Sequence, residues 1–396
     1  MSLRHYTDAF QQLAVQLPSE ERTAREASLQ RFTQAGFPTR KLEDWRYTDL
    51  SALTDQSYAL PSPATPDLSH LHLEAATAQI FVNGGDGAFT DTGREGGAVV
   101  ALNAAFARNG LDLDIGPGQS LAQPLHVLTW TGHRTSAMTH LRHRIRLGAN
   151  ARATVIFHHA GEGAYLTTQV TDIDLGPGAQ LTLYRVQDES AGSTHLAQSD
   201  VRLARDSVLD AISIDLGDGL ARHDLNVHLD APGAQAGLYG LYAPSGRAHV
   251  DNHTRIHHRA PHCGSREFFR GVVAGSARAV FNGKVVVHEQ AVKTDSETRV
   301  ANLLLSKTAE VYAKPELEIY NDDVKCAHGA TFGQIDEDAV YYLRARGLEA
   351  DVARALLTQA FAQQVIDRIT HAPLRALVTR RFLERLPQGA MLETLL

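Results

Sequence analysis

The sequence predicts a mainly β protein: a parallel β-helix core flanked by α-helical segments at both ends of the chain. Three observations predict this fold: strand-like runs with alternating apolar residues, turns that recur at a fixed period, and helical spacing confined to the two ends. A fixed period is typical of repeat proteins, in which each coil buries its apolar face by stacking on its neighbours.

The period is visible in the turns. The strings LGANA, LGPGA and LARDS begin at Leu147, Leu175 and Leu203, so the two steps, 175 − 147 and 203 − 175, are both 28 residues. Strand-like runs follow one another from about residue 140 to residue 335, and no helical pattern separates them. Without crossover helices a doubly wound sheet is disfavoured. An antiparallel sandwich with chance glycine turns is the remaining alternative.

The N-terminal segment is predicted to be helical. Phe10, Leu13 and Leu17 recur at helical spacing, and a second helix is expected from Ser19 to Gly36. Beyond Gln79 the period changes, and the apolar runs at 80–85, 99–106 and 126–130 are expected to be short strands.

The C-terminal segment is also predicted to be helical, with a second helix after Pro373. The first helix carries an apolar stripe formed by Leu348, Val352, Leu356, Phe361, Val365 and Ile369. Such helices can cap the open end of a solenoid or dock a partner, and both roles remain open.

These patterns give four expected segments along the chain. They are an N-terminal helical domain (1–60), a linker with the first strands (61–125), the β-helix core (126–340) and a C-terminal helical domain (341–396).

Composition bounds the function. The 396 residues carry a net charge of −7 and no long basic run, which argues against nucleic acid as a partner. The two cysteines, Cys263 and Cys326, suit a reducing compartment. The N-terminus does not resemble a secretory signal, and no stretch approaches the roughly 18 apolar residues of a membrane span. We therefore expect a cytoplasmic protein.

The sequence does not carry the motif of a nucleotide-binding site. A phosphate-binding loop requires Gly-Lys followed by Ser or Thr, whereas Gly283 and Lys284 are followed by Val285. If ATP is used, another subunit is expected to supply the ATPase.

A histidine-rich stretch, HVDNHTRIHHRAPHC at 249–263, is the first candidate metal site. On a strand His253 and His257 share a face while His258 points away, and the spacing matches no known zinc finger. Packing or surface roles are favoured for most of these histidines. A stand-alone metal-binding protein that uses His253, His257 and His258 stays open as an alternative function.

The second candidate is sharper, because Cys326 and His328 lie two residues apart. On a strand their side chains emerge on one face, about 7 Å apart, where they could hold a soft metal or half of a shared site. A buried cysteine beside a hydrogen-bonded histidine is the alternative. Asp322 and Asp323 suggest a β-helix carbohydrate-active enzyme, although adjacent residues on a strand point to opposite faces.

Several of these stretches resemble the SufB/SufD family of iron–sulfur cluster assembly proteins, and the resemblance covers about residues 40 to 370. The run from Lys314 to Asp336 is the most specific part. The matching strings are EDWRYTDL (43–50), VNGG (82–85), VVALNAAFARNG (99–110), HRAPHCGSREFFRGVV (258–273), AVFNGKVVVH (279–288), TDSETRVANLLLS (294–306), KPELEIYNDDVKCAHGATFGQID (314–336) and YYLRARGL (341–348).

The resemblance implies a right-handed parallel β-helix between helical domains, and a non-catalytic scaffold subunit of the SufBCD complex. It implies pairing with SufB through the β-helix and docking of the SufC ATPase on the C-terminal helical domain, so the stripe from Leu348 to Ile369 becomes the expected docking element. An isolated subunit could also pair with itself, as a homodimer, through the same sheet edge.

The resemblance also implies site residues. The functional histidine of the Cys-x-His-Gly-Ala-Thr motif is His328 here, and Cys326 is the weaker candidate. Both would contact transient iron or a nascent iron–sulfur cluster shared with SufB, with no cofactor bound permanently. The sulfur-accepting cysteine of SufB aligns with Leu343, which cannot carry a persulfide, so the chain resembles the D-type branch of the family.

Overall fold

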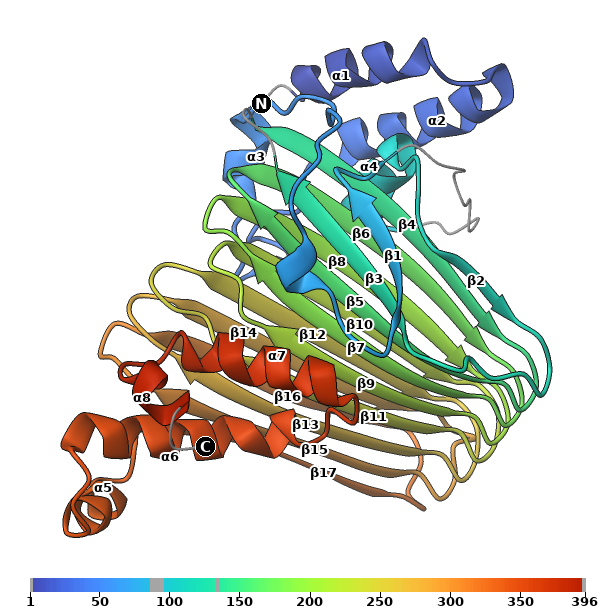
Figure 1. The fold of residues 1–396 in the computed structure, drawn as a ribbon. Helices are drawn as coiled ribbons and strands as arrows, with labels where there is room; N and C mark the ends of the chain where they lie inside the picture. The colour runs from blue at the N-terminus through green and yellow to red at the C-terminus, as the bar shows by residue number, and fades with distance from the viewer. Residues whose placement is uncertain (1–2, 86–95, 133–135, 394–396) are drawn as a thin grey trace.

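The chain coils into a solenoid built from two parallel β-sheets (Figure 1). A computed structural model describes residues 3–85, 96–132 and 136–393. Odd-numbered strands form a nine-stranded sheet, the odd sheet, and even-numbered strands form an eight-stranded sheet, the even sheet. Every strand pairing between named strands is parallel, which confirms the β-helix and rules out the antiparallel sandwich.

The odd sheet contains β1 (Thr77–Val82), β3 (Leu125–Gly132), β5 (Arg152–Glu162), β7 (Gln180–Glu189), β9 (Val208–Asp215), β11 (Gln235–Tyr242), β13 (Gly264–Val273), β15 (Asp295–Leu304) and β17 (Lys325–Gly333). The even sheet contains β2 (Asp112–Ile115), β4 (Ala137–Leu147), β6 (Tyr165–Leu175), β8 (Ser193–Leu203), β10 (Leu220–Leu229), β12 (His249–His258), β14 (Arg278–Val287) and β16 (Glu310–Ile319). The helices are α1 (Arg4–Ala14), α2 (Ser19–Ala35), α3 (Ser51–Asp55), α4 (Ala98–Phe106), α5 (Glu337–Arg344), α6 (Ala350–Ile366), α7 (Ala372–Leu383) and α8 (Gly389–Glu393).

The period in the sequence corresponds to one rung, which is one coil with a strand in each sheet. Val155, Leu183, Ala211 and Leu238 occupy the same register position on β5, β7, β9 and β11, and all four are buried in the interior. Stacking of like residues in such a column keeps apolar surface away from water along the whole solenoid.

The repeated turns share one backbone requirement. The fourth residue of LGANA, LGPGA and LARDS is Asn150, Gly178 and Asp206, and these have φ values of 57°, 68° and 55°. Gly, Asn and Asp are the residues that adopt this left-handed conformation most readily. The 28-residue spacing therefore marks where each coil turns the same corner.

The N-terminal helices pack on the outer face of the even sheet. Their apolar cluster includes Tyr6 and Phe32 and extends to Met138, Leu166 and Leu196 on β4, β6 and β8. The structure confirms the two helices that were predicted before residue 36.

One predicted element is wrong, because residues 99–106 form most of helix α4 and not a strand. This segment contacts α2 on one side and β4 and β6 on the other, so six of the nine residues of α4 are buried and the other three are partly buried. A short helix that is apolar all round shows no helical period, and its apolar run is indistinguishable from a buried strand. Asn103 Nδ2 fixes it by donating to the carbonyl oxygens of Leu141 and Thr168 at 2.9 and 3.1 Å.

The C-terminal helices lie along the outer face of the odd sheet (Figure 1). α6 contacts β11 and β13, and Phe382 of α7 is fully buried in the same cluster as Tyr184 and Val186 of β7. They therefore cover a flank of the solenoid, and the capping role that the sequence left open is not what they do. No helix among the described residues is long and apolar enough to cross a membrane.

A segment at 43–48, the strap, crosses the outer face of the even sheet and begins with a short 3-10 helix (Glu43–Trp45). Trp45 lies over the guanidinium of Arg222 on β10 at 3.8 Å, and Asp44 pairs with Arg255 on β12. At the far end of the strap, Glu43 pairs with Lys314 on β16 at 2.7 Å. The strap therefore ties several rungs to the N-terminal helical region.

Candidate metal site and partner surfaces

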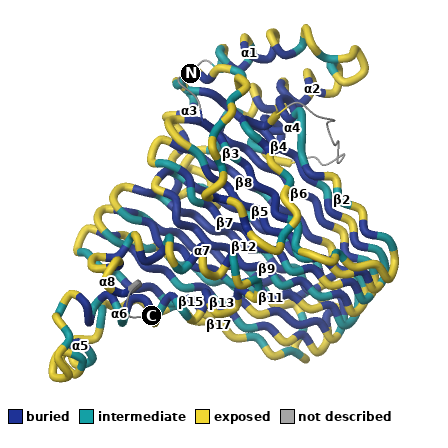
Figure 2. The backbone as a smooth tube through the Cα atoms, in the orientation of Figure 1, coloured by how far each residue is buried: buried dark blue, intermediate teal, exposed yellow. Residues whose placement is uncertain are grey.

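The last rung, formed by β16 and β17, is the exposed end of the solenoid. β16 ends the even sheet and β17 ends the odd sheet, and in the described part of the chain no strand pairs with their outer edges. Most of β17 is solvent-exposed, in contrast to the buried strands behind it (Figure 2). Two free edges at one end form a ready template for pairing with another chain.

Cys326 and His328 lie on this terminal strand. They sit opposite Ser296 and Thr298 of β15, and Cys326 packs partly against the solenoid core. Because residues two apart share a face, the predicted common face of Cys326 and His328 agrees with the observed register. His328 is exposed, and its side chain has no hydrogen bond or ion pair within the described residues.

The two side chains differ in their readiness to bind a metal. Burial raises the pKa of the Cys326 thiol, although the backbone at Ser296 partly opposes the shift. A thiol with a raised pKa is mostly protonated near neutral pH, and only the thiolate is a good ligand. His328 is therefore the more accessible of the two side chains, whereas Cys326 would need a nearby cation to ionise.

Behind His328 lies a buried polar column that the sequence alone did not suggest. Glu267, Thr298 and His328 occupy one register position on β13, β15 and β17. The Glu267 carboxylate accepts from Thr298 Oγ1 at 2.7 Å and from Thr254 Oγ1. Burial raises the pKa of Glu267, and the two hydroxyl donors only partly reverse that shift. The rung beneath His328 is thus fixed by hydrogen bonds.

Large apolar side chains surround this edge. Ile319 and Tyr320 at the end of β16 are 42% and 62% exposed, and Phe332 on β17 is 52% exposed. Exposed apolar groups beside open strand edges are typical of a protein–protein contact.

The predicted docking stripe turns out to face the solenoid. Val352, Val365 and Ile369 are buried against the odd sheet, and the other three stripe residues, Leu348, Leu356 and Phe361, pack partly buried against the same cluster. The surface that remains open lies on α5, where Tyr341 is 72% exposed and Tyr342 is 56% exposed. Leu343, also on α5, is half-buried.

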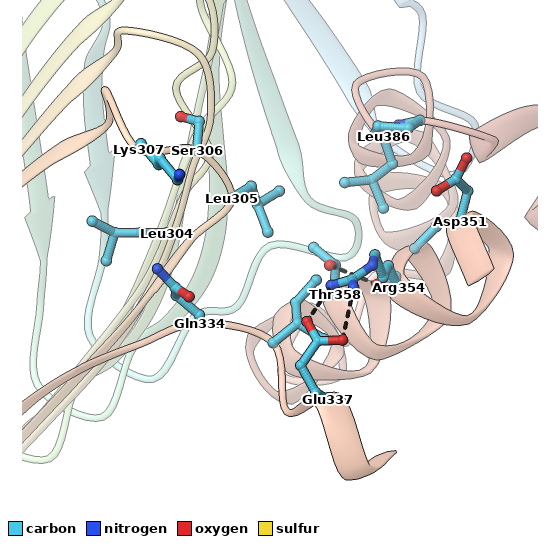
Figure 3. Close-up of a pocket in the computed structure, with 13 residues that line it drawn as sticks. Leu304, Leu305, Ser306, Lys307, Gln334, Glu337, Asp351, Arg354, Thr358 and Leu386 are labelled. Atoms are coloured by element: carbon cyan, nitrogen blue, oxygen red, sulfur yellow. Dashed lines mark hydrogen bonds and ion pairs between the residues drawn. The ribbon is translucent and has the colours of Figure 1, made fainter. Parts of the chain in front are cut away.

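A cavity of about 300 Å³ separates the C-terminal helices from the last odd strands (Figure 3). The turn at Leu304–Lys307 lines one side and residues of α5 and α6 line the other. Arg354 binds both carboxylate oxygens of Glu337, at 2.8 and 2.7 Å, and so holds α5 against α6. The cavity marks the junction between the exposed rung and the helical domain.

The structure confirms the faces predicted for the histidine-rich stretch, but its three candidate histidines do not come together in one site. His253 and His257 lie on the outer face of β12, whereas His258 is fully buried and bonded to Ser265. Asp323 lies in an exposed turn and pairs with Lys293 at 2.6 Å, so it does not line a catalytic groove.

Comparison with known proteins agrees with this geometry. Residues 129–361 match the family described as "SUF system FeS cluster assembly, SufBD core domain", and residues 2–81 match "SufBD protein N-terminal region". The chain belongs to the SufB/SufD family of iron–sulfur cluster assembly proteins.

Its relatives extend across bacteria. The SufD iron–sulfur cluster assembly protein of Escherichia coli is 32% identical over 91% of this chain and 92% of its own length. A SufBD family protein of Synechocystis is 33% identical over 69% of this chain and 63% of its own length. A SufBD family protein of Mycobacterium leprae is 27% identical over 84% and 86% of the two lengths. The sequence resemblance to the SufB/SufD family is thereby confirmed.

Proposed function

We propose that this chain is a D-type scaffold subunit of a SufBCD complex that pairs with SufB through its last rung and presents His328 to iron or a nascent cluster. The observation that carries the proposal is the position of His328, exposed and unbonded among the described residues, on the terminal strand of an open sheet edge. A neutral imidazole at a shared seam can contribute one ligand, while the partner contributes the rest.

Cys326 is a secondary ligand in this proposal. Its thiol is half-buried two residues from His328, so it could bind a cluster only after the iron itself lowers its pKa. The iron and sulfide are the cargo of the site, and the chain needs no permanently bound cofactor.

Docking of the SufC ATPase is proposed on the outer side of the C-terminal helical domain. The predicted stripe from Leu348 to Ile369 would hold that domain on the solenoid, while Tyr341 and Tyr342 offer the exposed aromatic surface. Aromatic side chains are enriched where partners bind. ATP hydrolysis would belong to SufC, and the complex would work in the cytoplasm.

The decisive experiment replaces His328 by Ala and measures cluster formation on the reconstituted complex by its visible absorbance. We expect cluster yield to fall at least about tenfold while SufB pairing on a sizing column is unchanged, because His328 is exposed and its loss leaves no cavity. His70→Ala, at another exposed histidine, is the matched control. Full cluster yield with His328→Ala would contradict the proposal.

A second experiment tests the docking surface. The double variant Tyr341→Ser and Tyr342→Ser should lose SufC in a pull-down, while Val15→Ser, at an 81% exposed residue in the N-terminal region, should retain it. Deleting residues 337–396 is less informative, because it would bare the apolar flank of the odd sheet. Undiminished SufC capture by the double variant would place the docking surface elsewhere.

A further inference from the structure

Three histidines from successive rungs stack on the outer face of the even sheet. His228 on β10, His257 on β12 and His288 just after β14 have ring centroids 5.1 and 5.7 Å apart along the stack. We call this set the histidine ladder. β10, β12 and β14 are neighbours in the even sheet (Figure 1), so the ladder crosses three rungs. His228 and His257 are register partners, whereas His257 pairs with Val286 and His288 lies two residues beyond it.

The ladder lies on the even sheet, whereas His328 lies at the free edge of the odd sheet. All three residues are partly exposed, although the His228 side chain is only 15% exposed. His257 also lines a wide pocket beside the strap, together with Lys284 and Glu318. The ladder is therefore a separate, accessible surface feature.

The distance between the ring nitrogens of His257 and His288 is long for a hydrogen bond and typical of two ligands of one metal ion. Nε2 of His288 and Nδ1 of His257 are 3.4 Å apart. Hydrogen bonds in proteins normally span about 2.7–3.2 Å, so this contact is long for an N–H···N bond. Two nitrogens that each lie about 2.0–2.1 Å from a tetrahedral ion are about 3.3–3.4 Å apart. The observed separation of 3.4 Å therefore leaves room for an ion between the two nitrogens.

His228, the third ring of the ladder, offers a further ligand. Nδ1 of His228 is buried and has no hydrogen-bond partner among the described residues, and Nε2 lies 3.6 Å from Asp200 Oδ1, beyond hydrogen-bond distance. An outer carboxylate commonly supports a histidine metal ligand, and Asp200 would have to move closer to take that role. His228 can therefore turn toward the pair, or support it from the next rung.

The guanidiniums beside the ladder are engaged in ion pairs, Arg255 with Asp44 and Arg259 with Asp230 at 3.0 Å. An unprotonated imidazole is the form that binds metals.

We propose that His257 and His288, supported by His228, bind a divalent first-row transition-metal ion such as Fe²⁺ or Zn²⁺. Imidazole suits these ions, and carboxylate-preferring ions such as Mg²⁺ would find too few oxygens here. Among the described residues no three His, Cys, Asp or Glu side chains already converge as a metal site, so water would complete the coordination. Such an open site holds its ion exchangeably, in contrast to closed structural zinc sites.

The test uses the purified full-length chain and two metal probes. Zn²⁺ binding is measured by calorimetry, and Co²⁺ binding by its visible spectrum, whose intensity distinguishes tetrahedral from octahedral coordination. The variants are His257→Gln, His288→Gln and His228→Gln, all in a His328→Ala background that removes the proposed cluster ligand. His262→Asn is the matched control, because His262 is exposed in the turn after β12 and Asn tolerates its φ of 58°.

We expect one ion per chain in the His328→Ala background, with a tetrahedral Co²⁺ spectrum. His257→Gln and His288→Gln should each raise the dissociation constant at least about tenfold, His228→Gln should raise it less, and His262→Asn should leave it unchanged. Unchanged affinity in His288→Gln would overturn the proposal, and so would equal losses in His262→Asn. Loss of binding in the His328→Ala background alone would also overturn it, by assigning the ion to the terminal rung.

Discussion

The coils near the two ends of the solenoid have the same architecture but differ in what covers their outer faces. At the N-terminal end nearly every residue of β4 is buried, because α1, α2 and α4 pack over the even sheet. At the other end most residues of β17 are exposed. The free edges themselves do not differ, since β1 and β2 end the two sheets at the first rung as β16 and β17 do at the last. The difference lies in the helices that cover the even sheet near the N-terminal end.

The largest effect is expected from opening the covered end. Phe32 is fully buried and packs edge-on against Tyr6 and Phe37, with ring centroids 5.3 and 5.1 Å away. Phe32→Ala should lower the free energy of unfolding by about 3–5 kcal/mol. Phe332→Ala at the exposed end should change it by less than about 0.5 kcal/mol but weaken pairing with SufB. Urea denaturation and a pairing assay measure both effects; equal destabilisation would break the comparison.

Removing the anchor of the strap should be nearly as costly. Burial alone would raise the pKa of Asp251, yet Arg222 at 2.7 Å and His253 keep it well below its usual range. Arg222→Ala leaves that buried carboxylate short of its cation, so we expect a loss of about 3–5 kcal/mol in the free energy of unfolding. Arg146→Ala, in an exposed pair with Asp114, is the control and should cost less than about 1 kcal/mol. A small loss with Arg222→Ala would mean that the strap adds little.

Lowering the pH should change stability in opposite directions near the two ends of the solenoid. Burial lowers the pKa of His140 and His143 to about 3 at the covered end. Between pH 6.5 and about 3 the unfolded chain binds protons that these folded histidines refuse, so stability falls as the pH drops. The slope is at most about 1.4 kcal/mol per pH unit for each histidine.

Near the exposed end, Glu267 has the opposite effect on the pH dependence of stability. Its pKa is raised by burial, so the stability that its protonated form contributes is lost as the pH rises through that value. Hydrogen exchange at pH 7.5 and 5.5 should show β4 losing protection in acid while β13 does not. His143→Gln should flatten the response of β4, and a uniform response along the chain would contradict this pattern.

The smallest effect is expected at the junction of the exposed rung with the helical domain. The Arg354–Glu337 pair is largely solvent-exposed, so Arg354→Ala should cost less than about 1 kcal/mol of global stability. Amide exchange in α5 should nevertheless increase, because this pair holds α5 against α6. Arg346→Ala, which removes only a contact with Tyr342 on the far side, is the control. Unaltered exchange in α5 would show that other contacts hold it.

Much of the fold could be predicted because each rung repeats a local requirement. The left-handed residues at Asn150, Gly178 and Asp206 leave a visible period, and the apolar stripe of α6 indicates a helix. The identity of the surface that buries the stripe could not be predicted, because an apolar stripe fits a sheet or a partner equally well. The apolar run of α4 carries no period at all and was misassigned for that reason.

The candidate site was predictable only along the strand. The spacing of Cys326 and His328 fixes a shared face, but their position at a free edge depends on where the solenoid ends. The histidine ladder escaped because its members are one rung apart: His228, His257 and His288 are separated by 29 and 31 residues. Neither step equals the 28-residue period of the turns, so a search at that fixed period would miss the ladder, and so would a search within 249–263.

The C-terminal helices lie along the outer face of the odd sheet, and this placement has a mechanical consequence. α6 contacts β11 and β13, the Tyr184 hydroxyl on β7 bonds Thr370 at 2.9 Å, and Arg381 on α7 pairs with Asp188 of β7 at 2.6 Å. A force applied to these helices is therefore a shear spread over several strands, not a peeling force on the outermost one. A movement of these helices would therefore tilt the solenoid as a rigid body. β17 would move with it and keep its backbone hydrogen bonds to β15.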